Sequence, residues 1–105
     1  MQEGQLIQHA GQGDQWAFQQ LVQLHHRAAW RTARVLLADP GMVEDALQEA
    51  WLDVWHGLPR FQPDRPLRPW LLSVVAHRCQ KFTRRRTLPV ISLESEAGDL
   101  VAGHP

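Results

Sequence analysis

Residues 43–58 read VEDALQEAWLDVWHGL, and this stretch decides the fold class. Its apolar residues recur at intervals of three and four, which places them on one face of a helix. That face consists of Val43, Leu47, Ala50, Trp51, Val54 and Leu58. Gly57 and Pro59 are residues that end helices, so the sequence predicts a helix from about Val43 to Leu58.

A longer helix is predicted before this one, over residues 15–37. Apolar residues recur there at the same spacing, and neither Gly nor Pro interrupts them. Asp14 precedes the stretch, and aspartate commonly caps the N-terminus of a helix. The turn-forming residues Asp39, Pro40 and Gly41 follow and are expected to end the helix.

Two further helices flank this pair. A short one is expected near the N-terminus, where Leu6, Ile7 and Ala10 are spaced as on one helical face. The last one is predicted from Pro69 to about Arg85, because proline suits the first turn of a helix, where its missing N–H costs nothing. The candidate core positions of this last helix are Leu71, Val74, Val75, Cys79 and Phe82.

The four segments together predict an all-α fold. Residues 1–87 are expected to form one compact bundle of three to four helices, since no alternating strand pattern of useful length is present. A chain of 105 residues leaves little room for a second domain. Residues 88–105 contain two prolines and three acidic residues, and an extended tail or linker is expected there.

Charge is unevenly distributed along the chain, although the formal net charge is zero. Residues 1–59 carry three basic and seven acidic side chains, whereas residues 60–86 carry eight basic ones against Asp64 alone. Such segregation indicates two different partners for the acidic and the basic segment.

Several classes of function are excluded. Cys79 is the only cysteine, and the six histidines lack the spacing of metal ligands, so no disulfide, metal site or cofactor is predicted. No recognisable catalytic motif is present, and the protein is not expected to be an enzyme. The polar N-terminus and the absence of a long apolar run predict a cytoplasmic protein without membrane insertion.

The first candidate site is the exposed face of the helix predicted at residues 43–58. Its members fall at helical intervals and are Asp45, Gln48, Glu49, Leu52 and Trp55. Carboxylates, an amide and a large aromatic ring together suit the docking of a basic helical partner. In the alternative interpretation Trp55 covers the core and the carboxylates only keep the surface soluble; the pattern alone does not separate the two.

The second candidate site is the basic loop and the helix that follows it. Arg65 and Arg68 precede Trp70, and five further basic residues follow at Arg78, Lys81, Arg84, Arg85 and Arg86. Arginine pairs with phosphate, and an indole ring stacks on an unpaired base, so this segment is typical of opened or single-stranded DNA binding. The alternative is a solvated basic helix end that complements the helix dipole.

Three motifs in this order resemble one known family. Residues 45–55, with Asp45, Gln48 and Glu49, are similar to the polymerase-binding segment of sigma factors. Gly13-Asp14 followed by Ala17-Phe18 resembles the opening of the extracytoplasmic-function class of the sigma-70 family, and residues 68–86 resemble its promoter-melting segment. The resemblance covers residues 6–93 and implies the helical domain called region 2.

The resemblance also implies partners and roles. Asp45, Gln48 and Glu49, with Leu52 and Trp55, would contact the clamp helices of the largest subunit of core RNA polymerase. The loop before Trp70 would capture a flipped-out base of the non-template strand, with Trp70 at the upstream edge of the opened promoter. The contacts with the minus-ten element would then come from Val74, His77, Arg78 and Lys81. An anti-sigma factor is a further partner that the resemblance implies.

The sequence departs from the family pattern at several positions. Trp51 stands where phenylalanine is usual, Ser73 where a basic residue is usual and His77 where asparagine is common; these departures concern the promoter sequence more than the fold. Residues 89–94 resemble the linker toward a second domain, region 4, which is missing here, so the chain is expected to be part of a longer factor. The alternatives are a stand-alone helical DNA-binding regulator and a protein-interaction module bound by an anti-sigma factor.

Overall fold

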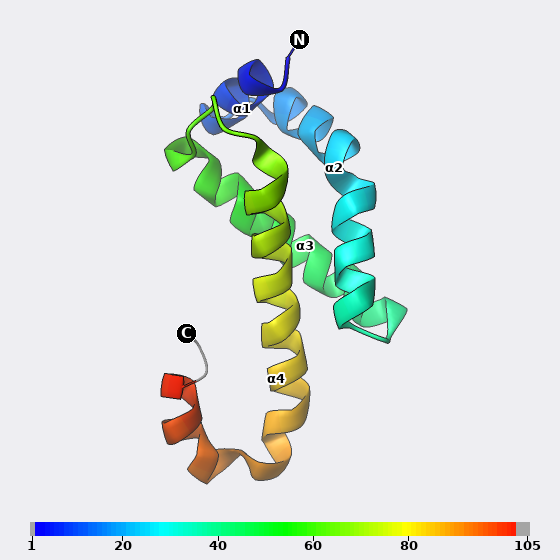
Figure 1. Ribbon diagram of the computed structural model, residues 1–105, viewed down its shortest axis with the longest axis vertical. Coiled ribbons are helices and arrows are strands. Elements are labelled where there is room, and N and C mark those ends of the chain that lie inside the picture. Colours follow the sequence, from blue (N-terminus) through cyan, green and yellow to red (C-terminus); the bar gives the residue numbers. More distant parts are fainter. Residues whose placement is uncertain (1, 103–105) are drawn as a thin grey trace.

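The computed structural model describes the backbone of residues 2–102 and the side chains of residues 2–84. In this part of the chain there are four α-helices, one 3-10 helix and no strand. The elements are α1 (Glu3–Gly11), α2 (Gln15–Leu36), α3 (Pro40–Gly57), η1 (Leu58–Arg60) and α4 (Leu67–Ala102) (Figure 1). The predicted all-α bundle is thereby confirmed.

Two aspartates determine where α2 and α3 begin. Asp14 accepts a hydrogen bond from the backbone N–H of Ala17 at 3.1 Å, as its predicted capping role requires. Asp39 accepts one from the N–H of Gly41 at 2.9 Å, and Pro40 occupies the first turn of α3. The helix α3 therefore starts three residues earlier than the predicted Val43, because the turn that ends α2 also caps α3.

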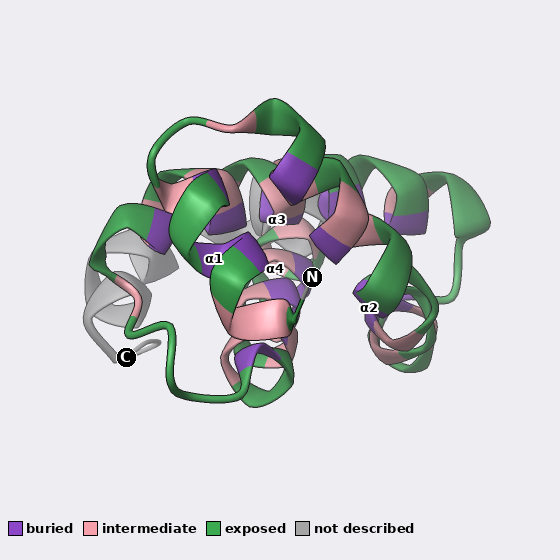
Figure 2. Cartoon of the chain, turned by 90° about the horizontal axis from the view of Figure 1, so that it is seen from above, coloured by how far each residue is buried: buried purple, intermediate pink, exposed green. Residues whose placement is uncertain are grey.

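The four helices pack around one core. The helix α4 runs along the molecule against α2 and α3, and α1 packs on α2 and on η1 (Figure 1). Figure 2 shows the buried positions of α1, α3 and α4 turned toward one another. Each element contributes to the largest fully buried side chains, which are Ile7, Leu21, Val43, Val54, Leu58, Leu67, Leu71, Val75 and Cys79. Burial raises the pKa of the Cys79 thiol, as expected for a core cysteine.

The last turn of α2 differs from the prediction. Val35 and Leu36 continue the helical spacing of apolar residues in this segment, but they are exposed, Val35 by 84%. The helix ends at Leu36 and Leu37 has extended backbone angles, so Leu37 takes the buried position instead. Helical spacing ceases to predict burial where the helix ends.

Both ends of α4 also differ from the prediction. The helix begins at Leu67, two residues before Pro69, and the backbone N–H of Leu67 donates to Glu3 Oε2 at 3.2 Å. This carboxylate satisfies an N–H of the first turn, and it comes from 64 residues away in the chain. At the other end, helical backbone continues to Ala102, so the expected extended tail was wrong up to that residue. Leu, Glu and Ala recur in this stretch and favour helix.

Candidate functional site

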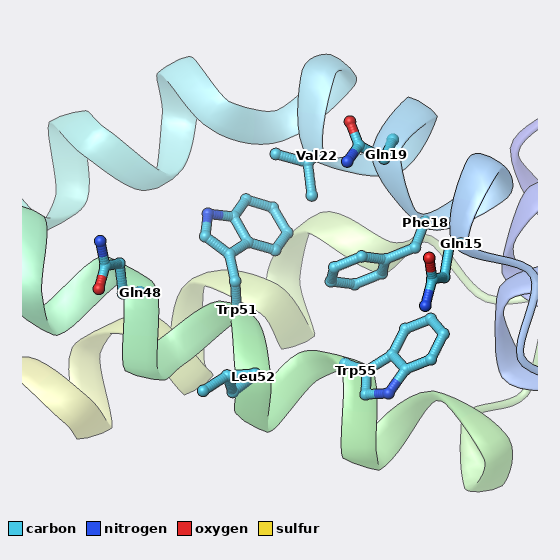
Figure 3. A pocket seen from close by; sticks show the side chains of 8 residues that line it. All are labelled: Gln15, Phe18, Gln19, Val22, Gln48, Trp51, Leu52 and Trp55. Atoms are coloured by element: carbon cyan, nitrogen blue, oxygen red, sulfur yellow. The ribbon is translucent and has the colours of Figure 1, made fainter.

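An apolar groove lies between α2 and α3 (Figure 3). We call it the α2–α3 groove; it has a volume of about 590 Å³ and is lined by Gln15, Phe18, Gln19, Val22, Gln48, Trp51, Leu52 and Trp55. The Phe18 ring meets Trp55 edge-on, with ring centroids 5.0 Å apart, and meets Trp51 at 6.1 Å. These three rings form an apolar surface that remains open to solvent, and Leu52 beside them is 57% exposed.

The predicted docking residues on α3 are only partly brought together by this groove. Gln48, Leu52 and Trp55 line it, whereas Asp45 is exposed beyond it and Glu49 points to α4. Trp55 is half-buried on Phe18, so it combines the two alternatives considered for it: it covers part of the core and also presents a ring edge.

The α2 side of the groove was missed by sequence reasoning. Gln15, Phe18, Gln19 and Val22 belong to a different helix, and a single helical pattern cannot show which second helix completes a groove. Trp51 was assigned to the core, and it is half-buried there while also lining the groove.

A second groove lies at the basic loop between η1 and α4. We call it the loop groove; it has a volume of about 530 Å³ and is lined by Arg60, Phe61, Gln62, Arg65, Pro66, Pro69 and Trp70. The rings of Phe61 and Trp70 pack with centroids 4.9 Å apart and an angle of 37° between their planes. Arg60 and Arg65 are exposed, so the groove combines positive charge with an aromatic wall. The contributions of Arg60 and Phe61 were not predicted.

Trp70 is held from behind by α3. A methyl group added at Gly57 would lie 2.9 Å from the Trp70 Cζ2 atom, so the indole rests directly on that glycine. Trp70 is nevertheless only half-buried. The ring is thus part of the packing and part of the groove wall at the same time.

Arg68, the next predicted site residue, belongs to a polar junction around the buried His25. Its Nε donates to Nδ1 of His25 at 3.2 Å, and Nε2 of His25 lies 2.8 Å from Glu3 Oε1. The imidazole is 5% exposed, whereas Arg68 itself is exposed. We call these three residues the Glu3–His25–Arg68 junction; it joins α1, α2 and the start of α4.

Arg78 makes a second polar cluster, further along α4. Its Nε and Nη2 donate to the two carboxylate oxygens of Asp53 at 2.6 and 3.0 Å, and its Nη1 donates to Glu49 at 2.9 Å. These hydrogen bonds lower the pKa of Asp53 and raise that of Arg78. A predicted DNA contact is therefore paired with a predicted polymerase contact, and a phosphate would have to compete with two carboxylates for Arg78.

Four of the predicted DNA contacts share one side of α4. Val74, His77, Arg78 and Lys81 line a shallow depression of about 520 Å³ together with Asp53 and Ser73. Arg84 lines a different depression, with Leu36 and Cys79. The side chain of Arg85 lies outside the described residues.

Neither a metal site nor a membrane-spanning helix is found among the residues that the structure describes. In residues 2–84 no three His, Cys, Asp or Glu side chains gather in a way that could hold a metal ion. None of the helices, over the residues that the structure describes, has the length and apolar character needed to cross a membrane.

Comparison with known proteins identifies the family. The model of the family described as Sigma-70 region 2 matches residues 21–88, which include most of α2, all of α3 and both grooves' aromatic walls apart from Phe18. The chain belongs to the sigma-70 region 2 family. The predicted resemblance is confirmed, and because sigma factors are transcription initiation factors, the prediction that the protein is not an enzyme is confirmed with it.

Individual sigma factors show the same relationship. The chain is 38% identical over 81 residues to the RNA polymerase sigma factor NccH of Alcaligenes xylosoxydans, covering 77% of this chain and 44% of NccH. It is 34% identical to CnrH of Cupriavidus metallidurans (90% of this chain, 50% of CnrH) and 35% identical to the ECF sigma factor SigM of Mycobacterium tuberculosis (78% and 42%). The chain thus spans about half the length of the curated relatives it matches.

A solved sigma factor structure shares the fold of this region 2 domain. It is the structure of CnrH in complex with the cytosolic domain of CnrY, with a TM-score of 0.72 and 31% identity. The match covers 97% of this chain and 66% of that chain. The region 2 bundle described above is therefore the fold of a known sigma factor.

Proposed function

We propose that this region 2 domain binds core RNA polymerase and recognises and melts the minus-ten element of a promoter. The observation that carries the proposal is the loop groove, which is lined both by the packed rings of Phe61 and Trp70 and by the exposed Arg60 and Arg65. Such a surface suits an unpaired base and its phosphate together, because the base can stack on an aromatic ring while arginine binds the backbone. The domain would act in the cytoplasm, with the polymerase.

The polymerase would dock on α3. Gln48, Leu52 and Trp55 offer an amide, an exposed aliphatic side chain and an aromatic edge along one groove, and Asp45 adds an exposed carboxylate. Exposed apolar groups with polar neighbours are the composition of a protein interface. The partner surface implied by the family resemblance is the pair of clamp helices of the largest subunit.

The non-template strand would follow α4 away from the loop groove. A flipped base would enter beside Trp70, with Arg65 at the phosphate, and the next nucleotides would meet Val74, His77 and Lys81. Arg84 and Arg85 would extend the basic path. No covalent step is required, because binding of the unpaired strand offsets an unstacking cost of a few kcal/mol per base.

Two titrations test the proposal. In the first, Gln48 and Glu49 are both changed to alanine, and affinity for core polymerase is measured; we expect a loss of roughly 1–3 kcal/mol by analogy with interface hot spots. Gln8→Ala, an exposed amide on α1, is the matched control and should bind normally. Unchanged affinity of the double variant would sink the polymerase half of the proposal.

The second titration measures binding of a labelled non-template minus-ten oligonucleotide in the presence of core polymerase. Affinity should fall as salt rises, because phosphate contacts release counterions. A signal that does not depend on salt, or no binding even with polymerase present, counts against the DNA half.

A regulatory protein is a second candidate partner, favoured by the CnrH structure, which contains the cytosolic domain of CnrY. We propose that an anti-sigma helix would occupy the α2–α3 groove, because that groove is apolar and open. Such a protein should compete with core polymerase for this domain. A stand-alone DNA-binding regulator is less well supported, because it would have no binding partner for the open, apolar α2–α3 groove.

A further inference from the structure

The proposed binding of polymerase and DNA does not account for the buried His25. Among residues 2–84 it is the one polar side chain in the core, at 5% exposure, and it lies between α1 and α4. A buried polar group without a hydrogen bond destabilises the fold, so both ring nitrogens of His25 are expected to have hydrogen-bond partners.

The partners determine which nitrogen carries the proton. The Arg68 guanidinium can only donate, so Nδ1 of His25 must accept its hydrogen bond at 3.2 Å. The ring is then neutral, with its proton on Nε2, which donates to Glu3 Oε1 at 2.8 Å. A neutral ring thus links a cation to a carboxylate, and all three groups are satisfied.

The same carboxylate also positions the start of α4. Its second oxygen, Oε2, accepts from the N–H of Leu67, and Arg68 Nη2 reaches the carbonyl oxygen of Leu24 at 3.4 Å. The guanidinium is therefore held on two of its nitrogens while remaining exposed. Arg68 immediately precedes Pro69 and Trp70, which line the loop groove.

We propose that His25 and Glu3 are positioning residues for DNA recognition: they hold the exposed Arg68 guanidinium at the start of α4, on the α2 side of this helix, where it meets a phosphate of the non-template strand. This inference rests on the proposed DNA-binding function. An arginine that is already ordered loses less conformational entropy when the strand arrives, so the junction increases affinity without touching DNA.

A double-mutant cycle tests the proposal on the full chain bound to core polymerase, with the minus-ten oligonucleotide as the probe. His25→Leu and Arg68→Ala should each weaken oligonucleotide binding about five- to tenfold, the scale of one lost charge-assisted contact. In the Arg68→Ala background, His25→Leu should cause almost no further loss, because the imidazole acts only through the guanidinium. A merely structural role for His25 would give losses that multiply.

Three further variants sharpen the result. His25→Asn retains an acceptor near the Nδ1 position and should recover most of the affinity, whereas His26→Leu, a change at the exposed neighbouring residue, should leave it unchanged. If His25→Leu also loses polymerase binding, Glu3→Gln replaces it in the cycle, since it disturbs the junction without creating a cavity. Its smaller loss, about threefold, should likewise disappear in the Arg68→Ala background.

The possible failures are distinguishable. If the wild-type chain with polymerase binds the oligonucleotide but Arg68→Ala binds it equally well, the positioning role is overturned and the proposed function stands. The positioning role is also overturned if the losses of His25→Leu and Arg68→Ala multiply. If the wild-type chain does not bind the oligonucleotide at all, the proposed function fails, and the inference fails with it.

Discussion

The α2–α3 groove and the loop groove are similar in size and differ in their rims. Their volumes are about 590 and 530 Å³, and each contains packed aromatic rings. The rim of the first consists of glutamines and aliphatic side chains, whereas that of the second carries Arg60 and Arg65 between prolines. Aromatic rings alone therefore do not indicate the partner; the charge of the rim distinguishes a groove that suits a protein from one that suits a base and its phosphate.

The two grooves also differ in how they are held. The α2–α3 groove lies between two long helices, so its shape depends on ordinary helix packing. The loop groove lies on an irregular segment between η1 and α4, which is tied down by the Glu3–His25–Arg68 junction and by Trp70 against Gly57. Changes that act on one groove should consequently leave the other intact.

The largest expected effect is that of Trp70→Ala. The ring is half-buried on Phe61 and Gly57, so its removal should cost about 2–4 kcal/mol of stability, toward the lower end of the range for large aromatic truncations. Base stacking worth roughly 1–3 kcal/mol should be lost as well. A thermal melt and a permanganate footprint of unpaired thymines measure the two effects, and a variant with normal melting and a normal footprint would contradict both.

Gly57→Ala separates packing from stacking at the same ring. The added methyl group, 2.9 Å from Trp70 Cζ2, must displace the indole without removing it. Alanine also favours helix more than glycine, so part of the stability cost is offset. We expect Gly57→Ala to lower the melting temperature less than Trp70→Ala does, and to reduce the footprint clearly. If the two variants lose the same melting temperature and the same footprint, Trp70 serves packing alone.

A charge introduced into the α2–α3 groove should affect polymerase binding and leave stability almost unchanged. Leu52 is 57% exposed, so Leu52→Asp should change stability by no more than about 0.5 kcal/mol. Affinity for core polymerase should fall about tenfold or more, because a carboxylate would be buried at the interface. Leu24→Asp, at 54% exposure on α2, is the matched control. Equal polymerase affinity of the two variants would show that the α2–α3 groove is not the docking surface.

How far the sequence predicts this molecule depends on the range of each interaction. Local signals were sufficient for the helices: Asp14 caps α2 as predicted, and the apolar face of residues 43–58 is buried except for the half-buried Trp51. Contacts distant in sequence were not predictable. Glu3 accepts hydrogen bonds from the backbone N–H of Leu67 and from the His25 ring. These partners are 64 and 22 residues away, and helical periodicity does not indicate contacts over such distances in the sequence.

The candidate site shows the same division. Runs of basic and aromatic residues indicated the loop and α4, but they could not show that Arg78 is paired with Asp53 and Glu49 or that Arg68 is held by His25. Counting charges overestimates how many are available, because an arginine in a folded protein often neutralises a nearby carboxylate.

Arg65→Ala tests the rim of the loop groove directly. Arg65 is exposed, so stability should hardly change. Oligonucleotide affinity should fall by roughly 1 kcal/mol, about equally for different sequences, and the slope of log affinity against log salt should decrease by about one. Arg31→Ala, an exposed arginine on α2, is the matched control. A sequence-dependent loss with an unchanged slope would instead assign Arg65 to base recognition.

The smallest expected effect concerns Asp53 and Arg78, on the stretch of α4 that leads away from the loop groove. The hydrogen bonds from Arg78 hold the pKa of Asp53 below its ordinary value, so the stability that this pair contributes is present above the ordinary aspartate pKa of about 3.9 and is lost as pH falls further. The Asp53 side chain is 34% exposed, and such pairs are worth about 0.5 kcal/mol after screening. In urea unfolding, the advantage of the wild type over Asp53→Asn should therefore be small at pH 6 and should decrease as pH falls below the ordinary aspartate pKa of about 3.9. Asp64→Asn in the exposed loop should show no such change. An advantage that persists unchanged to pH 3 would mean that Asp53 acts through packing rather than charge.

If the pair is as weak as expected, a phosphate of the DNA strand can compete for Arg78 at little cost in free energy. The basic path along α4 can then include Arg78 once DNA is bound.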